Sequence, residues 1–111
     1  LIHTYTIQHA LDAFEGAKNF SVPYLIMAGS NDKIVEAAKI PEFFHATTGV
    51  KDKTCIWWEG MFHELHNEPE KRHVWAQALK WFEERLNKTV ETNTFLVATV
   101  QNDTLNLQAK L

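Results

Sequence analysis

The residues best suited to chemistry in this chain are Asp32 and His63, because each lies in a loop that directly follows a predicted strand. A neutral imidazole acts as a general base through one ring nitrogen, while the other nitrogen must donate to an acceptor that fixes the tautomer. A carboxylate fills that role and also stabilises the imidazolium that forms. A histidine with such a partner moves protons in both directions near neutral pH. Asp32 and His63 are therefore candidates for two members of a Ser-His-Asp system.

The third member of such a system, a serine on a turn of its own, has no counterpart in these 111 residues. A nucleophile at a strained strand-to-helix turn carries the pattern Gly-x-Ser-x-Gly, which does not occur here. The serines are Ser21 and Ser30. Ser30 stands two residues before Asp32, where we expect a structural hydrogen bond in the acid loop. The sequence thus predicts a base and its orienting acid without a nucleophile.

Two predicted strands position these residues. Residues 22–28 form a nearly continuous apolar run, which is typical of a strand buried on both faces of a parallel sheet. Residues 53–58 are rich in β-forming side chains. A helix is expected between them at residues 36–47, where Pro41 marks either its first turn or a kink.

This strand–helix–strand order implies parallel strands joined by a right-handed crossover. The carboxyl ends of parallel strands meet at one edge of the sheet, and adjacent strands lie about 4.8 Å apart. Asp32 and His63 each follow such an end within a few residues. We therefore expect the carboxylate and the imidazole to meet at this edge.

Further helices are expected on either side of this unit, at residues 4–18 and 68–86. Asn67 is the expected N-cap of the second helix, with Glu70 three residues on as in a capping box, and Pro69 fits its first turn. Apolar residues at helical spacing predict a buried stripe on that helix. The stripe consists of Trp75, Leu79, Phe82 and Leu86, widened by Val74, Ala78 and Trp81.

The last part of the chain, residues 89–111, differs in character. Residues 95–100 are apolar, residues 105–111 alternate between apolar and polar, and the turn-prone Gln101-Asn102-Asp103 separates them. This pattern predicts a β-hairpin. An isolated hairpin is marginally stable in water, so we expect it to pack on the domain or on a partner.

Composition limits the remaining function classes. The net charge of −3 and the pI of about 6.1 give no electrostatic case for nucleic acid, and no apolar run approaches the roughly 18 residues of a membrane span. The single cysteine, Cys55, lies in a predicted strand, which indicates a buried structural thiol. The first residue is Leu1 rather than Met, and a length of 111 residues fits one small domain or a piece of a larger one.

Other histidines and charges compete with this interpretation. His66 is the alternative base, although a structural loop residue is the simpler reading. The string from His63 to His66 lacks the His-Glu-x-x-His spacing of a zinc protease, so a metal site of His63, His66 and Glu68 is disfavoured. Residues 51–53 are expected in a solvated loop. Surface positions without partners are expected for His3, His9, His45 and His73.

The two loop segments resemble parts of the α/β-hydrolase fold. Gly29-x-x-Asp32 is similar to the Gly-x-x-Asp loop that supplies the triad acid, and Glu59-Gly60-x-x-His63 is similar to the Glu-Gly-x-x-His loop that supplies the base. The resemblance covers roughly residues 5–86. It is strongest to the monoacylglycerol lipase and lysophospholipase group, also described as serine-aminopeptidase-like hydrolases.

This resemblance implies an α/β fold in which residues 1–88 form the C-terminal part of a hydrolase domain, with two parallel strands and flanking helices, and residues 89–111 form a divergent tail. It implies a serine hydrolase of lipid esters such as monoacylglycerols or lysophospholipids, with Asp32 orienting His63 and with no cofactor or metal. The serine would come from a missing N-terminal part or a complementing chain. The resemblance favours a cytoplasmic or membrane-associated location with peripheral membrane contact.

The alternative is a non-catalytic binding module built on a truncated hydrolase fold. In that case the hairpin would cover the sheet edge left by the missing strands, or pair with a partner. The isolated chain would also expose a Trp-rich apolar face, which favours association.

Overall fold

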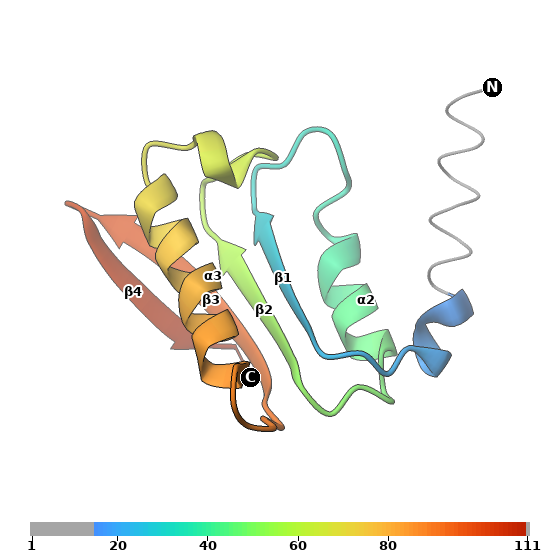
Figure 1. The fold of residues 1–111 in the computed structure, drawn as a ribbon. Helices are drawn as coiled ribbons and strands as arrows, with labels where there is room; N and C mark the ends of the chain where they lie inside the picture. Colours follow the sequence, from blue (N-terminus) through green and yellow to red (C-terminus); the bar gives the residue numbers. More distant parts are fainter. Residues whose placement is uncertain (1–14, 111) are drawn as a thin grey trace.

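The structure, a computed structural model, describes residues 15–110, which are built around one four-stranded sheet (Figure 1). The strands lie side by side in chain order, the first three are parallel, and the fourth is antiparallel to the third. Residues 4–14 of the helix predicted at residues 4–18 lie outside the described residues. Residues 15–16 are helical and lead into the short 3-10 helix η1 (Ala17–Asn19). The strands are β1 (Tyr24–Gly29), β2 (Lys53–Trp58), β3 (Asn93–Gln101) and β4 (Thr104–Ala109).

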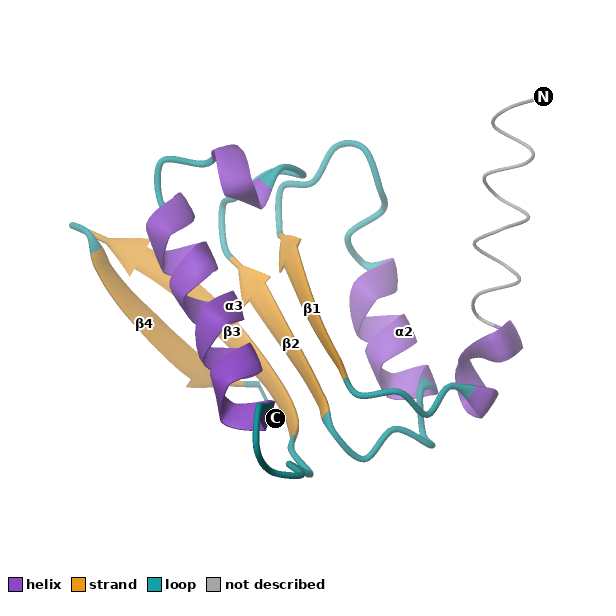
Figure 2. Ribbon diagram, viewed as in Figure 1, coloured by secondary structure: helices purple, strands orange, loops and turns teal. Residues whose placement is uncertain are grey.

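Two helices, α2 (Lys39–Ala46) and α3 (Lys71–Arg85), pack on opposite faces of this sheet (Figure 2). Successive side chains of a strand point to opposite faces, and the two apolar clusters follow that alternation. Phe44 of α2 packs with Cys55 and Phe95 on one face. On the other face, Val74 of α3 packs with a cluster that includes Ile56, Trp58 and Ala98. The α/β class is thus confirmed.

The predicted strands and the central helix are confirmed, with one exception in burial. Pro41 lies in the first turn of α2, where a missing N–H costs little, so it does not kink the helix. The expectation that the first strand is buried on both faces is wrong for residues 24–27, which are only half-buried. Within residues 15–110, β1 pairs with β2 alone and forms an edge of the sheet.

The predicted hairpin is also confirmed, and it continues the parallel sheet. Asn93 lies opposite Lys53 and Ala98 opposite Trp58, so β2, α3 and β3 form a second strand–helix–strand crossover. Asn102 and Asp103 turn the chain with φ of 51° and 61°. Two positive φ values are typical of the tight turn that suits the twist of a hairpin. The hairpin extends the sheet from β2 and leaves the outer edge of β1 open among the described residues.

The start of α3 differs from the prediction. The N-cap residue is Glu70, without a side-chain cap bond, so the capping box based on Asn67 is wrong. Asn67 instead ends a short 3-10 helix, η2 (Leu65–Asn67), and its side-chain amide donates to Glu64 Oε2 at 2.6 Å. Pro69 lies before the first turn of α3 rather than in it. Asn67, which the sequence predicts as the N-cap of the helix, is therefore part of η2 instead.

The predicted buried stripe of α3 is wrong as well. Its four residues are between 58% and 72% exposed, whereas Val74 is 3% exposed. Trp81 also faces the sheet, where its indole N–H donates to Thr54 Oγ1 at 3.3 Å. The apolar residues of α3 span a wider arc of the helix surface than the sheet covers. Periodicity locates this arc but does not show which part of it packs on the sheet. The exposed residues are Trp75, Leu79, Phe82 and Leu86, here called the α3 stripe.

The predicted solvated loop at residues 51–53 is wrong for two charged residues. Asp52 and Lys53 are each 4% exposed. Lys53 Nζ donates to Phe44 O at 2.5 Å and to Thr47 O at 3.1 Å, so it satisfies carbonyls at the C-terminal end of α2. Burial lowers the pKa of the Lys53 ammonium. Asp52 is paired with Arg85, the last residue of α3.

Cys55 is fully buried beneath α2, which confirms a structural thiol. Burial raises the pKa of this thiol to about 12. Because the thiolate is the reactive form, we expect folded protein not to react with a thiol reagent such as DTNB at pH 8. Reaction should begin only as urea unfolds the chain, with the same midpoint as the loss of circular dichroism. Rapid labelling without denaturant would contradict this placement.

No helix within residues 15–110 has the length and apolar character needed to cross a lipid bilayer.

Candidate active site

The loop after β1, which carries Asp32 and is here called the acid loop, is joined by backbone hydrogen bonds to the loop after β2, which carries His63 and is here called the histidine loop. Gly29 and Trp58, the last residues of the two strands, lie opposite each other in the parallel ladder. The ladder continues beyond them, because Ser30 N–H donates to Trp58 O at 3.0 Å and Asn31 N–H donates to Met61 O at 2.8 Å. These backbone hydrogen bonds alone fix the acid loop against the histidine loop.

Ser30 has the structural role that sequence suggested, but it acts across the two loops. Its Oγ accepts the backbone N–H of Gly60 at 2.7 Å. Asn31 Nδ2 donates to the carbonyl of the same residue at 3.3 Å. Gly60 has φ of 80°, a conformation that side chains disfavour, so glycine lets the histidine loop turn here. Ser30 and Asn31 thus hold the turn that leads to His63.

Gly29 allows the two loops to approach closely. A Cβ atom at this position would lie 2.3 Å from the carbonyl oxygen of Met61 and 2.4 Å from that of Phe62. These are backbone atoms of the histidine loop, and they cannot rotate away as a side chain can. The glycine of the Gly29-x-x-Asp32 pattern is therefore required by the backbone that passes over it.

Asp32 and His63 are in direct contact at the rim of the sheet where the parallel strands β1 and β2 end. His63 Nδ1 lies 2.8 Å from Asp32 Oδ2. The other carboxylate oxygen, Oδ1, accepts the backbone N–H groups of Ile34 at 2.8 Å and Val35 at 3.0 Å. The Asp32 side chain is 7% exposed and that of His63 is 40% exposed. The acid is fixed inside the loop, while the imidazole reaches toward the surface.

The environment of Asp32 favours its charged form. Burial alone would raise its pKa, but hydrogen bonds from Val35, His63 and Ile34 and the charge of a protonated imidazole together lower the pKa below its ordinary value. Asp32 is therefore ionised at neutral pH and acts as a hydrogen-bond acceptor. With Nδ1 donating to this carboxylate, Nε2 is the ring nitrogen that can accept a proton from a nucleophile.

A shallow depression beside His63 has a mainly apolar wall. Ile34 and Phe62, which are 72% and 49% exposed, line it together with His63. Glu68 braces this wall, because its Oε1 accepts the backbone N–H of Phe62 at 2.8 Å. The sequence suggests Glu68 only as a metal ligand, and nothing in its local pattern signals the contact across η2. Other lining residues are Lys33, Glu64 and Asn67.

His66 does not take the place of His63. It lies in η2 and lines a second hollow with Met27 and Trp75, to which His63 also contributes. Within residues 15–110, no group of three or more His, Cys, Asp or Glu side chains has an arrangement that could hold a metal ion. The structure thus brings Asp32 together with His63 and leaves His66 outside that contact.

A second histidine–carboxylate contact lies outside this rim. His73 Nε2 is 3.1 Å from Asp103 Oδ1, and Arg72 pairs with the other oxygen of the same carboxylate. The expectation that His73 lacks a partner is wrong, because its partner lies in the β3–β4 turn, far away in sequence. Asp103 is largely exposed. This contact fastens the start of α3 to the hairpin, and we assign it a structural role.

Residues 3–70 match the family described as serine aminopeptidase, S33. The chain belongs to this family of α/β-hydrolases. The matched region contains both loops of the rim, including Asp32 and His63, and it ends just before α3 begins at Lys71. The hairpin therefore lies beyond the part of the S33 domain that the match covers.

Two relatives agree with this membership. The chain is 30% identical over 82 residues to an uncharacterized abhydrolase domain-containing protein of Dictyostelium discoideum, and the aligned region covers 74% of this chain and 9% of that protein. It is 35% identical over 57 residues to phospholipase YtpA of Bacillus subtilis, and this aligned region covers 51% of the chain and 22% of YtpA. This S33 chain thus spans less than a quarter of either relative.

Proposed function

We propose that this S33 chain supplies the acid and the base of a serine hydrolase that cleaves carboxylic esters of lipids. The observation that carries the proposal is the 2.8 Å contact between His63 Nδ1 and an ionised, loop-held Asp32 carboxylate. This contact fixes the tautomer in which Nε2 is a base. The serine hydroxyl would come from another part of a hydrolase domain, because no Gly-x-Ser-x-Gly pattern occurs in this sequence.

In the proposed reaction, His63 moves protons in both directions. Nε2 takes the hydroxyl proton as the serine oxygen attacks the ester carbonyl, and the resulting imidazolium is stabilised by Asp32. The imidazolium then gives this proton to the leaving alcohol as the ester C–O bond breaks. A water molecule attacks the acyl-enzyme in the same way, with His63 again as the base, and releases the carboxylic acid.

Two features favour an apolar ester as substrate. Ile34 and Phe62 provide exposed apolar surface next to His63, where an acyl chain would gain from burial. One relative is named a phospholipase, which is in keeping with a glycerolipid substrate and peripheral contact with a lipid surface. Monoacylglycerols and lysophospholipids remain the proposed substrate class.

The proposal predicts that the purified 111-residue chain does not turn over a p-nitrophenyl ester, since a base without a nucleophile cannot form an acyl-enzyme. Release of p-nitrophenol should equal that of the His63→Ala variant, which controls for hydrolysis catalysed by the His63 imidazole alone. The measurement is initial rate at pH 8 with p-nitrophenyl butyrate. If the isolated chain turned over the ester in a way that depends on His63, the chain would contain a nucleophile of its own and the prediction would be wrong.

The second candidate function is a non-catalytic binding module, and the exposed α3 stripe favours it. The two candidates differ in what a nucleophile-bearing partner would do. For the enzyme, activity appears on assembly and is lost with His63→Ala. For the binding module, assembly occurs without any esterase activity.

A further inference from the structure

β4 forms an edge of the sheet on the side away from β1 (Figure 1). Within residues 15–110 it pairs with β3 alone. Lys110 N–H donates to Phe95 O at 2.8 Å, and the residues of an antiparallel strand alternate between those that bond to the neighbouring strand and those that do not. The even-numbered residues of β4 therefore bond to β3, and Leu105, Leu107 and Ala109 direct their N–H and C=O groups outward.

This edge lacks the features that usually prevent a strand from pairing with another chain. Exposed edges are commonly protected by charged residues, proline or a β-bulge. The six residues of β4 include no charged residue and no proline. Their register with β3 runs from Gln101 opposite Thr104 to Leu96 opposite Ala109 without an extra residue, so the ladder has no bulge. A further strand can therefore bond along the whole length of β4.

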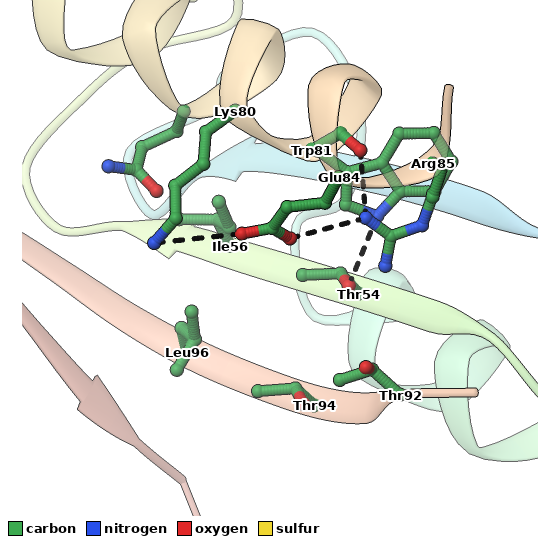
Figure 3. Close-up of a pocket in the computed structure, with 10 residues that line it drawn as sticks. Thr54, Ile56, Lys80, Trp81, Glu84, Arg85, Thr92, Thr94 and Leu96 are labelled. Atoms are coloured by element: carbon green, nitrogen blue, oxygen red, sulfur yellow. Dashed lines mark hydrogen bonds and ion pairs between the residues drawn. The ribbon is translucent and has the colours of Figure 1, made fainter. Parts of the chain in front are cut away.

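The cover that α3 gives to the sheet ends at β3. Lys80 and Glu84 of α3 line a small cleft with Leu96 of β3 (Figure 3). Leu105 and Leu107 of β4 pack on the same apolar cluster but are only half-buried. Strands lie about 4.8 Å apart and a helix is about 10 Å wide, so a strand added to β4 would cover both leucines without meeting α3.

We propose that β4 pairs with β4 of a second copy of this chain, antiparallel and centred on Leu107, so that the two sheets join. In this register, Leu107 bonds to Leu107 of the copy and Leu105 bonds to Ala109, so every outward-facing residue has a partner. Side chains that lie opposite each other share a face of the sheet. Apolar side chains therefore meet on the α3 face, and Asn106 meets Gln108 on the other face. The strand is complementary to itself.

Charge also favours a second copy as the partner. The same register places Lys110 of each copy opposite Thr104 of the other, beside the turn that carries Asp103. Lys110 lies over the Phe95 ring at 5.2 Å from its centroid, and Asp103 is 65% exposed. The two-fold axis repeats this attraction, which helps to fix the register. A pairing of this kind closes on itself as a two-fold dimer, the commonest symmetry of soluble oligomers.

The dimer leaves the acid–base contact of each copy free. The two-fold axis reverses the strand direction, so the rims that carry Asp32 and His63 lie at opposite ends of the joined sheet. β1 lies at the far edge and takes no part in the contact. The assembly is therefore independent of whether the chain takes part in ester hydrolysis.

Sedimentation velocity of the purified 111-residue chain over a concentration series tests the pairing. Two six-residue strands form a small contact, of the class below about 1,200 Å² that dissociates readily, so we expect a reversible monomer–dimer equilibrium. Ala109→Pro removes an outward N–H and places a ring in the path of the copy, so it should abolish the dimer. Proline is tolerated where an edge N–H faces away from the sheet, so circular dichroism should not change.

Added charge tests the register. In the double variant Asn106→Lys with Gln108→Lys, lysines of the two copies lie opposite each other, so the dissociation constant should rise at least about tenfold. The matched control is Thr99→Lys with Gln101→Lys. It adds the same charge at exposed positions on the same face of β3, one strand further from the contact. Screening at about 0.15 M salt should leave its dissociation constant within about twofold of the unmodified chain.

A cysteine at the centre of the contact gives an independent check. Leu107→Cys would place two thiols across the axis at a Cα separation of about 5.5 Å, which a disulfide accepts. Asn106→Cys lies opposite Gln108 of the copy, so it should not cross-link. Cys55 is fully buried and does not compete.

The results that would overturn the proposed dimer are specific. A chain that remains monomeric up to about 1 mM, or a dimer that Ala109→Pro leaves intact, overturns the pairing of β4. Cross-linking of Asn106→Cys instead of Leu107→Cys overturns the register centred on Leu107. A reversible dimer that Ala109→Pro abolishes, together with cross-linking of Leu107→Cys, supports both.

Discussion

Gly29→Ala is expected to separate the acid loop from the histidine loop and to destabilise the chain by about 3 kcal/mol, the upper part of the range for overpacked positions. A glycine-to-alanine change in a strand ordinarily stabilises by about 0.5–1 kcal/mol through chain entropy. Here the new Cβ would lie 2.3 Å from Met61 O and 2.4 Å from Phe62 O. Because both atoms belong to backbone, the clash outweighs the entropy gain.

Two measurements check this expectation. Urea unfolding gives the loss of stability, and the imidazole ¹⁵N spectrum reports whether His63 Nδ1 still donates to Asp32. Gly16→Ala is the matched control, since a Cβ there meets nothing within 4 Å and the backbone has an ordinary φ of −78°. A Gly29→Ala variant as stable as the Gly16→Ala variant, with the His63 signal unchanged, would show that the loops are not packed as described.

The rim of the sheet could be predicted because its determinants are local. Each strand is marked by β-forming residues, each ends in a turn, and parallel pairing brings both turns to one edge. Asp32 and His63 therefore meet as their positions along the chain predict. The requirement for Gly29 is different, since it arises from carbonyls of residues 61 and 62 that only the folded chain brings near.

The remaining differences come from partners that lie far away in sequence. Periodicity located the apolar arc of α3 but could not show that the sheet takes Val74 and Trp81 rather than the α3 stripe. The third parallel strand was missed because β3 reads equally well as one half of an isolated hairpin. Asp52 looked solvated because its counterion, Arg85, lies 33 positions away at the end of α3.

Breaking the pair of Asp52 and Arg85 should have the largest effect on stability. Arg85 Nε and Nη2 lie 2.6 and 2.8 Å from the two carboxylate oxygens, and Asp52 is only 4% exposed. Asp52 Oδ1 also accepts the backbone N–H of Thr92, so the pair links the starts of β2 and β3 to the end of α3. Arg85→Ala leaves a buried carboxylate without its counterion, which costs about 3–5 kcal/mol.

Urea unfolding at pH 7 measures this loss, and the double variant Asp52→Leu with Arg85→Met provides the control. Removing both charges leaves neither one buried and unpaired, so the double variant should be more stable than Arg85→Ala. A loss below about 1 kcal/mol for Arg85→Ala would contradict the assignment, because that is the value of a solvent-exposed ion pair.

The same pair predicts how stability depends on pH. The hydrogen bond from Arg85 lowers the pKa of Asp52, burial opposes this, and the Thr92 N–H and the Arg85 charge add to the lowering. Because the folded pKa lies below the ordinary value of 3.8, the stabilisation is complete above that value and disappears as pH falls through the folded pKa. The chain should therefore lose stability on acidification below about pH 4, and the double variant should lose measurably less over the same range.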